Sequence, residues 1–92
     1  MSSVWQIEFS DTARKQIAKL DRSMVAEILR YLRERIAISE DPKRFGEPLR
    51  RDLVRFWKYR IGAYRLICNV QESKMVVLVL RLDDRSKVYG GH

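Results

Sequence analysis

The chain has 92 residues, of which 46% are hydrophobic and 34% are charged, so it is long enough for one soluble domain and not for two. A single cysteine, Cys68, excludes an internal disulfide and fits a reducing compartment. The longest apolar run, "MVVLVL", has six residues, far fewer than the ~20 that span a bilayer. Glu8 and Asp11 lie where a signal peptide would be apolar. We therefore expect one domain over residues 1–92, located in the cytoplasm and without a membrane partner.

The net charge of +7 is concentrated in one part of the chain. Residues 1–41 contain seven basic and seven acidic side chains, and residues 66–92 contain four basic and three acidic ones. Residues 42–65 contain eight basic side chains against two acidic ones. Charge needed only for solubility would be scattered, whereas a concentrated basic region is typical of proteins that contact phosphates. The sequence thus predicts a polyanionic partner.

The first half of the chain predicts one strand and two helices. Residues 4–9 alternate apolar and polar side chains, as a strand with one buried face does. Ser10 is a suitable N-cap for a helix over residues 11–20. Asp21 or Ser23 caps a second helix that runs to about Ile38, with apolar residues at the helical period.

The second half predicts a loop and then three strands. Residues 39–49 contain both prolines and a glycine, which favours a loop. Residues 55–61, 64–70 and 75–82 follow a period of two, and their short connections indicate consecutive antiparallel strands. The predicted fold is α+β, in the order β-α-α-β-β-β, with a two-helix hairpin packed on one face of a small, mostly antiparallel four-stranded sheet.

Alternation along the strands places several cations on one face of this sheet. Lys58 and Arg60 alternate with Trp57, Tyr59 and Ile61, so the two sets point to opposite faces. Two helices can cover only one face of the sheet. We therefore expect Lys58, Arg60 and, from the next strand, Arg65 to form a cationic concavity on the other face.

Several kinds of active site are excluded. The one histidine is His92, the last residue, which argues against Ser/His/Asp chemistry. No Cys/His or Asp/Glu cluster has the spacing of metal ligands, so no metal is expected. No phosphate-binding glycine loop is present. Asp83 and Asp84 are neighbours that would point apart on a strand, and a turn or cap role suits them better than paired catalysis.

The remaining lysine, arginine and tyrosine side chains suffice for one reaction, the attack of an RNA 2′-hydroxyl on the adjacent phosphate. The substrate supplies the nucleophile, and the protein must orient it, stabilise charge and move two protons. Like charges around Lys58 disfavour its ammonium form and make it a candidate base. Arg60, Arg65 and Arg85 could stabilise the phosphate, and Tyr89 could stack on a base or donate a proton. From the residues alone, a basic strand face is more often a plain polyanion-binding surface than an active site, so polyanion binding is the first expectation and RNA cleavage is the alternative.

The aromatic residues have a structural interpretation as well. Trp57, Tyr59 and Tyr64 lie on or beside the cationic strands, where they could stack on bases. Aromatic side chains dominate the cores of small domains, however, and this pattern favours a core or core-rim position for all three.

Two stretches carry a resemblance to a known family. "RFWKYRIGAYRLICNV" (55–70) and "MVVLVLRLDDRSKVY" (75–89) resemble the RelE branch of the RelE/ParE toxins, and "GEPLRRDL" (46–53) resembles the segment before that family's second strand. The resemblance implies the fold described above, a toxin neutralised by a cognate antitoxin, and metal-independent cleavage of mRNA on the ribosome. It also implies that operator DNA is contacted only through the antitoxin complex.

The resemblance places functional positions on Lys58, Arg60, Arg65, Arg85 and Tyr89. Some relatives carry lysine at the position of Arg60, which leaves Lys58 as the better candidate base. The family often shows glycine and then histidine or a cation where this chain has its acidic pair, so Tyr89 and Arg85 stay as alternative proton donors. A second set of basic residues, the outer cations, is expected to bind the phosphates of ribosomal RNA. These are Lys43, Arg44, Arg50, Arg51 and Arg55.

Two alternative functions have the same predicted fold. One is a ParE-like inhibitor that binds a topoisomerase and catalyses nothing, and the other is a nucleic-acid-binding module that acts with an antitoxin. Fold does not decide among them. The cationic face together with Tyr89 favours the nuclease, because a protein-binding inhibitor requires neither.

Overall fold

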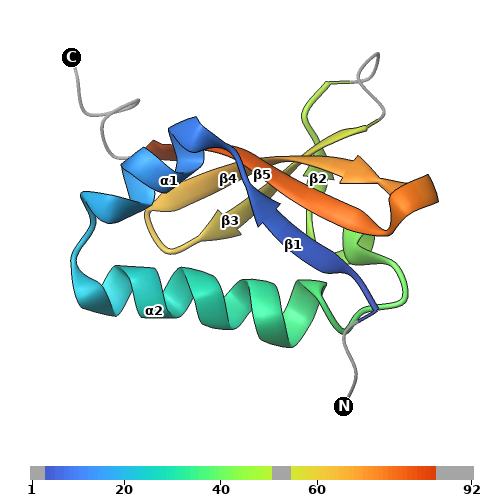
Figure 1. Cartoon of the computed structure of the whole chain (residues 1–92), viewed down its shortest axis with the longest axis horizontal. Helices are drawn as coiled ribbons and strands as arrows, with labels where there is room; N and C mark the ends of the chain where they lie inside the picture. The colour runs from blue at the N-terminus through green and yellow to red at the C-terminus, as the bar shows by residue number, and fades with distance from the viewer. Residues whose placement is uncertain (1–3, 51–54, 85–92) are drawn as a thin grey trace.

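The computed structural model describes residues 4–50 and 55–84. Two helices and five strands follow one another with short helical turns between some of them (Figure 1). The regular elements are β1 (Gln6–Phe9), α1 (Asp11–Ala18), α2 (Arg22–Tyr31), β2 (Glu47–Pro48), β3 (Phe56–Ile61), β4 (Tyr64–Gln71) and β5 (Val76–Asp84). The turns are η1 (Leu32–Ile36), η2 (Pro42–Phe45) and η3 (Glu72–Lys74). None of the described helices is long and apolar enough to cross a membrane.

The strands form one mixed sheet in the order β1-β5-β4-β3-β2. β1 pairs with β5 in parallel, and all other pairs are antiparallel, which confirms the predicted α+β fold with a mostly antiparallel sheet. The predicted number of four strands is wrong, because β2 adds a fifth inside the segment expected to be a loop. Pro48 lies in this strand, and proline is tolerated there because β2 is at the edge of the sheet.

Both helices begin at the predicted caps. The Ser10 side chain accepts a hydrogen bond from the Ala13 N–H (3.1 Å), and Asp21 accepts one from the Met24 N–H (2.9 Å). α2 ends at Tyr31, earlier than expected, and continues as the wider turn η1, in which the Ala37 N–H donates to the Leu32 carbonyl (2.8 Å).

The core lies between the helices and one face of the sheet. Ala13, Ile28 and Leu32 from the helical side meet alternate residues of the strands in a single buried cluster. The strand residues of this cluster are Tyr59, Ile61, Leu66, Cys68, Val70, Val77, Val79 and Leu82. No described helix covers the opposite face, which we call the open face. Directly paired strand residues share a face, so the register defines what the open face carries.

Candidate anion-binding site

The β3–β4 hairpin brings the three predicted strand cations together. Arg60 pairs directly with Arg65, and Lys58 pairs with Ile67 two positions further along the hairpin. Gly62, with a φ of 59°, allows the tight turn that fixes this register. The expected cationic concavity on the open face is therefore present.

The segment around η2 folds over β3 and completes the site. The Tyr59 hydroxyl donates to the Pro42 carbonyl (2.9 Å), and the Tyr31 hydroxyl donates to the Phe45 carbonyl (3.2 Å). A Cβ at Gly46 would lie 2.6 Å from the Lys58 carbonyl oxygen and 2.8 Å from the Tyr59 ring. Only glycine permits so close an approach.

The result is a pocket of about 220 Å³ with four cations and one carboxylate. Its lining residues are Arg44, Phe45, Gly46, Glu47, Lys58, Arg60 and Arg65. Lys58 Nζ lies 3.8 Å from Glu47 Oε2, a loose and partly exposed ion pair. We call this the cationic pocket.

Arg65 is the least satisfied of the four cations. Its Nε atom is buried and has no hydrogen-bond partner among the residues that the structure describes. A buried donor without a partner is costly, and a bound oxyanion would remove that cost. Guanidinium groups bind phosphate through paired N–H donors, so the pocket suits a phosphate better than a neutral ligand. Residues 4–50 and 55–84 contain no group of three potential metal-ligating side chains.

The other predicted site residues lie in different places. Arg44, predicted as an outer cation, lines the cationic pocket. Lys43 instead pairs with Glu72 (2.6 Å), with its Nζ 5.8 Å from the centre of the Trp57 ring. Arg50 and Arg55 are exposed near the ends of the two described ranges. Three further predictions fall outside the described residues: Arg51, Arg85 and Tyr89.

The aromatic residues belong to the core, as the sequence favoured. Tyr59 is fully buried, and burial raises the pKa of its hydroxyl far above the ordinary value. Trp57 and Tyr64 pack against the core cluster. Cys68 is also fully buried, and burial raises the pKa of its thiol, so it has the character of a core residue and not of a nucleophile.

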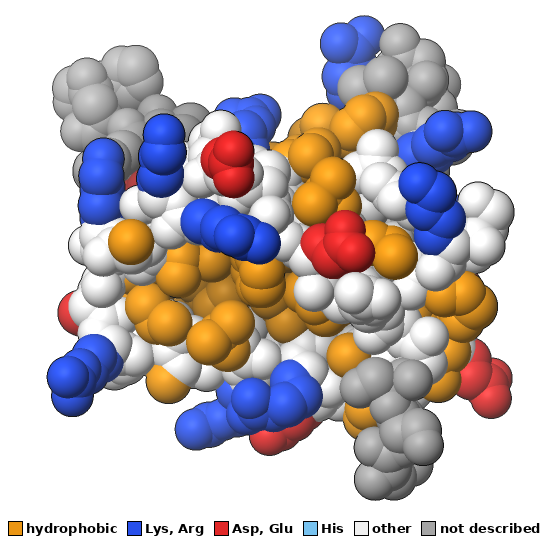
Figure 2. All heavy atoms as spheres, in the orientation of Figure 1, with side chains coloured by type: hydrophobic (Ala, Val, Ile, Leu, Met, Phe, Trp, Pro, Cys, Tyr) orange, Lys and Arg blue, Asp and Glu red, His pale blue; other side chains and the backbone are white. Residues whose placement is uncertain are grey.

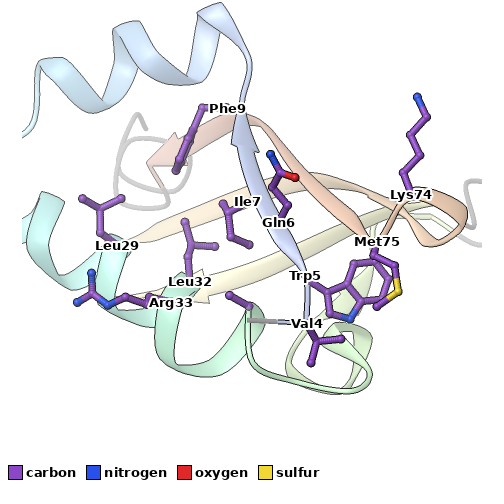
Figure 3. A pocket seen from close by; sticks show the side chains of 11 residues that line it. Val4, Trp5, Gln6, Ile7, Phe9, Leu29, Leu32, Arg33, Lys74 and Met75 are labelled. Atoms are coloured by element: carbon purple, nitrogen blue, oxygen red, sulfur yellow. The ribbon is translucent and has the colours of Figure 1, made fainter. Parts of the chain in front are cut away.

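A second feature lies at the other side of the molecule, between β1 and α2. It is a groove of about 610 Å³. Figure 3 shows Leu29 and Leu32 pointing from the helix towards Ile7 and Phe9 of β1. Arg33 and Lys74 stand at its margin, and Figure 2 shows hydrophobic side chains gathered between basic ones on this face. We call this the apolar groove.

Sequence reasoning did not identify this groove, and it did not place Arg44 in the cationic pocket or Arg81 on the open face. Leu29 is one of the apolar residues at the helical period of the second helix, yet 39% of it is exposed. Arg44 needed the position of η2, which no local pattern gives. Arg81 on β5 was not singled out, although the structure places it on the open face opposite Ile67. The sequence did contain a signal for Arg81, because a charged residue interrupts an otherwise apolar strand there.

This chain is a small α+β domain whose open sheet face gathers four cations around one pocket, a charge pattern that suits a polyanionic ligand. Residues 7–89 match the family described as the ParE toxin of type II toxin–antitoxin systems. Toxin RelG of Mycobacterium tuberculosis is 32% identical over 85 residues, which cover 92% of this chain and 95% of that protein.

Solved structures agree with this assignment. The M. tuberculosis RelBE2 toxin–antitoxin complex contains a chain with 30% identity and a TM-score of 0.78, covering 94% of this chain and 95% of that one. The isolated E. coli RelE toxin has the same fold, with 23% identity, a TM-score of 0.70 and coverage of 95% and 93%. The chain belongs to the RelE/ParE family of type II toxins, in the RelE branch.

Proposed function

We propose that this toxin is a ribosome-dependent endoribonuclease that cuts translated mRNA and is held inactive by a cognate antitoxin. The observation that supports it most is the convergence of Arg44, Lys58, Arg60 and Arg65 on one pocket. The buried Nε of Arg65, which has no hydrogen-bond partner within the described ranges, supports it as well. A pocket built in this way binds a phosphodiester and stabilises additional negative charge on it.

The proposed reaction is an internal transfer within the RNA. The 2′-oxygen attacks the adjacent phosphorus, and the bond from phosphorus to the 5′-oxygen of the next nucleotide breaks. The products are a 2′,3′-cyclic phosphate and a 5′-hydroxyl end. One proton leaves the 2′-hydroxyl and another reaches the departing 5′-oxygen, so the protein needs no nucleophile of its own. Arg60 and Arg65 face the charge that develops on the phosphate oxygens.

Lys58 is the candidate base. It is the one lysine among the side chains that line the cationic pocket, and a neutral amine can accept a proton whereas a guanidinium cannot. Its partner Glu47 is on the edge strand β2, and the two side chains form only a loose pair at 3.8 Å, so Lys58 keeps access to the substrate. Tyr89 and Arg85 are the candidates for the proton donor.

The outer cations Arg50, Arg51 and Arg55 are proposed to contact ribosomal RNA. Such contacts are electrostatic and independent of sequence, and they would hold the open face against the message. Lys43, whose ammonium group pairs with Glu72, is proposed for the same role.

The apolar groove is proposed to receive the antitoxin. The chain of known structure with 30% identity was solved in a toxin–antitoxin complex. Leu29, Val4 and Met75 border the groove with about two fifths of their surface exposed, which is unfavourable in water unless a partner covers them. Arg33 and Lys74 at the margin favour a segment that combines apolar and acidic side chains.

A second candidate function follows from the family match, whose description names the ParE toxin. In that case the chain would inhibit a topoisomerase without catalysis. The cationic pocket would then serve only as a surface, and its residues would not affect RNA.

One experiment separates the two functions. The chain is expressed briefly in cells, and the 5′ ends of translated messages are mapped for the wild type, Lys58→Ala and Arg65→Ala, with Arg14→Ala on the helical side as the matched control. We expect cuts in phase with codons that fall by about 100-fold in the two pocket variants and persist in the control. Growth arrest with intact messages and damaged DNA would instead support the topoisomerase inhibitor.

A further inference from the structure

Strand β5 contains an irregularity that determines where Arg81 points. Cys68 of β4 pairs with Val79, but the next residue, Ile67, pairs with Arg81, so Leu80 is an extra residue on β5. Val77 and Val79 face the core, and strict alternation would send Arg81 to the core as well. The bulge reverses the alternation, so Arg81 is exposed on the open face and Leu82 enters the core.

Side chains from the helical side hold this bulge in place. The Ser10 N–H donates to the Val79 carbonyl (2.9 Å), and the Ser10 hydroxyl donates to the Leu80 carbonyl (2.5 Å). The Gln16 amide donates to the Leu82 carbonyl (2.9 Å) and accepts from the Leu82 N–H (2.7 Å). These bonds pair backbone groups of Val79, Leu80 and Leu82, the residues at and beside the bulge, and so favour this arrangement of β5.

Arg81 and Lys58 lie on one line across the sheet. Arg81 of β5 and Lys58 of β3 both pair directly with Ile67 of β4, from opposite sides. Two residues further along β4, Arg65 pairs with Asp83 of β5. Two strand spacings place the backbones of Lys58 and Arg81 about 10 Å apart, a gap that their long side chains can reduce. An RNA strand that enters the cationic pocket and continues across β4 would reach Arg81.

Arg81 is also held in a defined orientation. Its Nη1 lies 2.9 Å from Oδ1 of Asp83, and the two side chains are 52% and 24% exposed. A guanidinium has five N–H donors, so one bond to a carboxylate leaves others for a phosphate. An exposed pair of this kind contributes little to stability, which leaves orientation as its main effect.

We propose that Arg81 binds the substrate phosphate next to the scissile one and that Asp83 is a positioning residue that orients its guanidinium. This inference rests on the proposed function for the identity of the ligand, a single-stranded RNA. It assigns a use to one residue of the acidic pair at 83–84. It also gives a reason for the bulge at Leu80, since without it the substrate path would end at β4.

The test measures binding of the full chain to a single-stranded 2′-O-methyl RNA, which cannot be cleaved because its 2′-oxygens are capped. A series of oligonucleotides carries one uncharged methylphosphonate at successive positions. For the wild type we expect two neighbouring positions at which affinity falls about tenfold. In Arg81→Ala one of these penalties disappears, and the salt slope of binding falls by about 0.7. Arg14→Ala should keep both penalties.

Asp83→Asn tests positioning separately from charge. Removing the carboxylate should raise the overall affinity, yet the penalty at the Arg81 position should shrink at least about twofold, because the guanidinium is no longer fixed. An unchanged penalty in Asp83→Asn would overturn the positioning role. An unchanged profile in Arg81→Ala, or a wild-type profile without two neighbouring positions, would overturn the phosphate contact. The methylphosphonate profiles could match these expectations while translated messages stay intact in cells. In that case the proposed nuclease function fails and the phosphate contact of Arg81 stands.

Discussion

The cationic pocket and the apolar groove differ in almost every physical respect. The pocket, of about 220 Å³, lies on the open face, is lined by four cations and depends on a glycine and two tyrosine hydroxyls for its shape. The groove, of about 610 Å³, is lined mainly by aliphatic and aromatic side chains from β1 and the facing helix. A small domain can thus keep a cationic surface and an apolar one apart by placing them on different faces of its sheet.

The difference follows from how the helices cover the sheet. Both helices contribute to a single core on one face, so charges from β3, β4 and β5 collect on the other. β1 stands at the far edge of the sheet, beyond β5 (Figure 1). α2 packs on the sheet through Ile28 and leaves the apolar groove between β1 and Leu29. Ile7 and Phe9 therefore keep a half-covered position beside Leu29.

The largest expected effect would come from placing a charge in the groove. Leu29→Glu should weaken antitoxin binding by on the order of 100-fold or more, because a buried unpaired carboxylate is costly. RNA cleavage should stay within about twofold of the wild type, since the pocket is on the other face. Titration calorimetry with the antitoxin and a cleavage assay measure the two effects.

Ile38→Glu is the matched control for the groove. Ile38 is as exposed as Leu29, at 39%, but does not line the groove. Equal losses of antitoxin affinity in both variants would show that the groove is not the docking surface.

A smaller effect is expected from Gly46→Ala, which acts on the pocket and not on the groove. The added methyl group meets the Lys58 carbonyl and the Tyr59 ring, neither of which can move freely. We expect the free energy of unfolding to fall by about 1–3 kcal/mol and cleavage to fall about tenfold, with antitoxin affinity unchanged. Urea unfolding and cleavage rates on the same sample check this, and full activity in the variant would contradict the shape assigned to the pocket.

The smallest effect is expected from Tyr59→Phe, which removes the hydrogen bond to Pro42 and should cost about 1 kcal/mol at neutral pH. Burial raises the pKa of the Tyr59 hydroxyl in the folded state. The stability that depends on its protonated form is therefore complete below the unfolded pKa of about 10 and is lost as pH rises above it. Unfolding measured between pH 7 and 11 should show the difference between the two proteins narrowing above about pH 10. A difference that widens there would contradict this pKa direction.

Local patterns in the sequence predicted much of the fold. Alternation placed Lys58 and Arg60 opposite Tyr59 and Ile61, and the caps Ser10 and Asp21 located both helix starts. β2 was missed because Pro48 and its neighbours favour a loop by composition, whereas their pairing with β3 depends on the docking of η2.

The candidate site was predicted only where it follows from strand alternation. Lys58, Arg60 and Arg65 could be placed on one face because their strands are consecutive. Arg44 joins them through long-range hydrogen bonds of Tyr59 and Tyr31 that no sequence pattern reveals. Arg81 was missed because a bulge changes which face a residue occupies, and the bonds from Ser10 and Gln16 that hold it come from a distant helix.

The chemical role of the cationic pocket is tested most directly with a translated message that carries a single 2′-deoxy nucleotide on the 5′ side of the cleaved bond. Attack by the 2′-hydroxyl is impossible there, so cleavage at that bond should disappear. A 2′-deoxy nucleotide one position away should leave the rate of cleavage at that bond unchanged. Cleavage of the modified bond at the normal rate would mean that the nucleophile does not come from the RNA, and the proposed mechanism would be wrong.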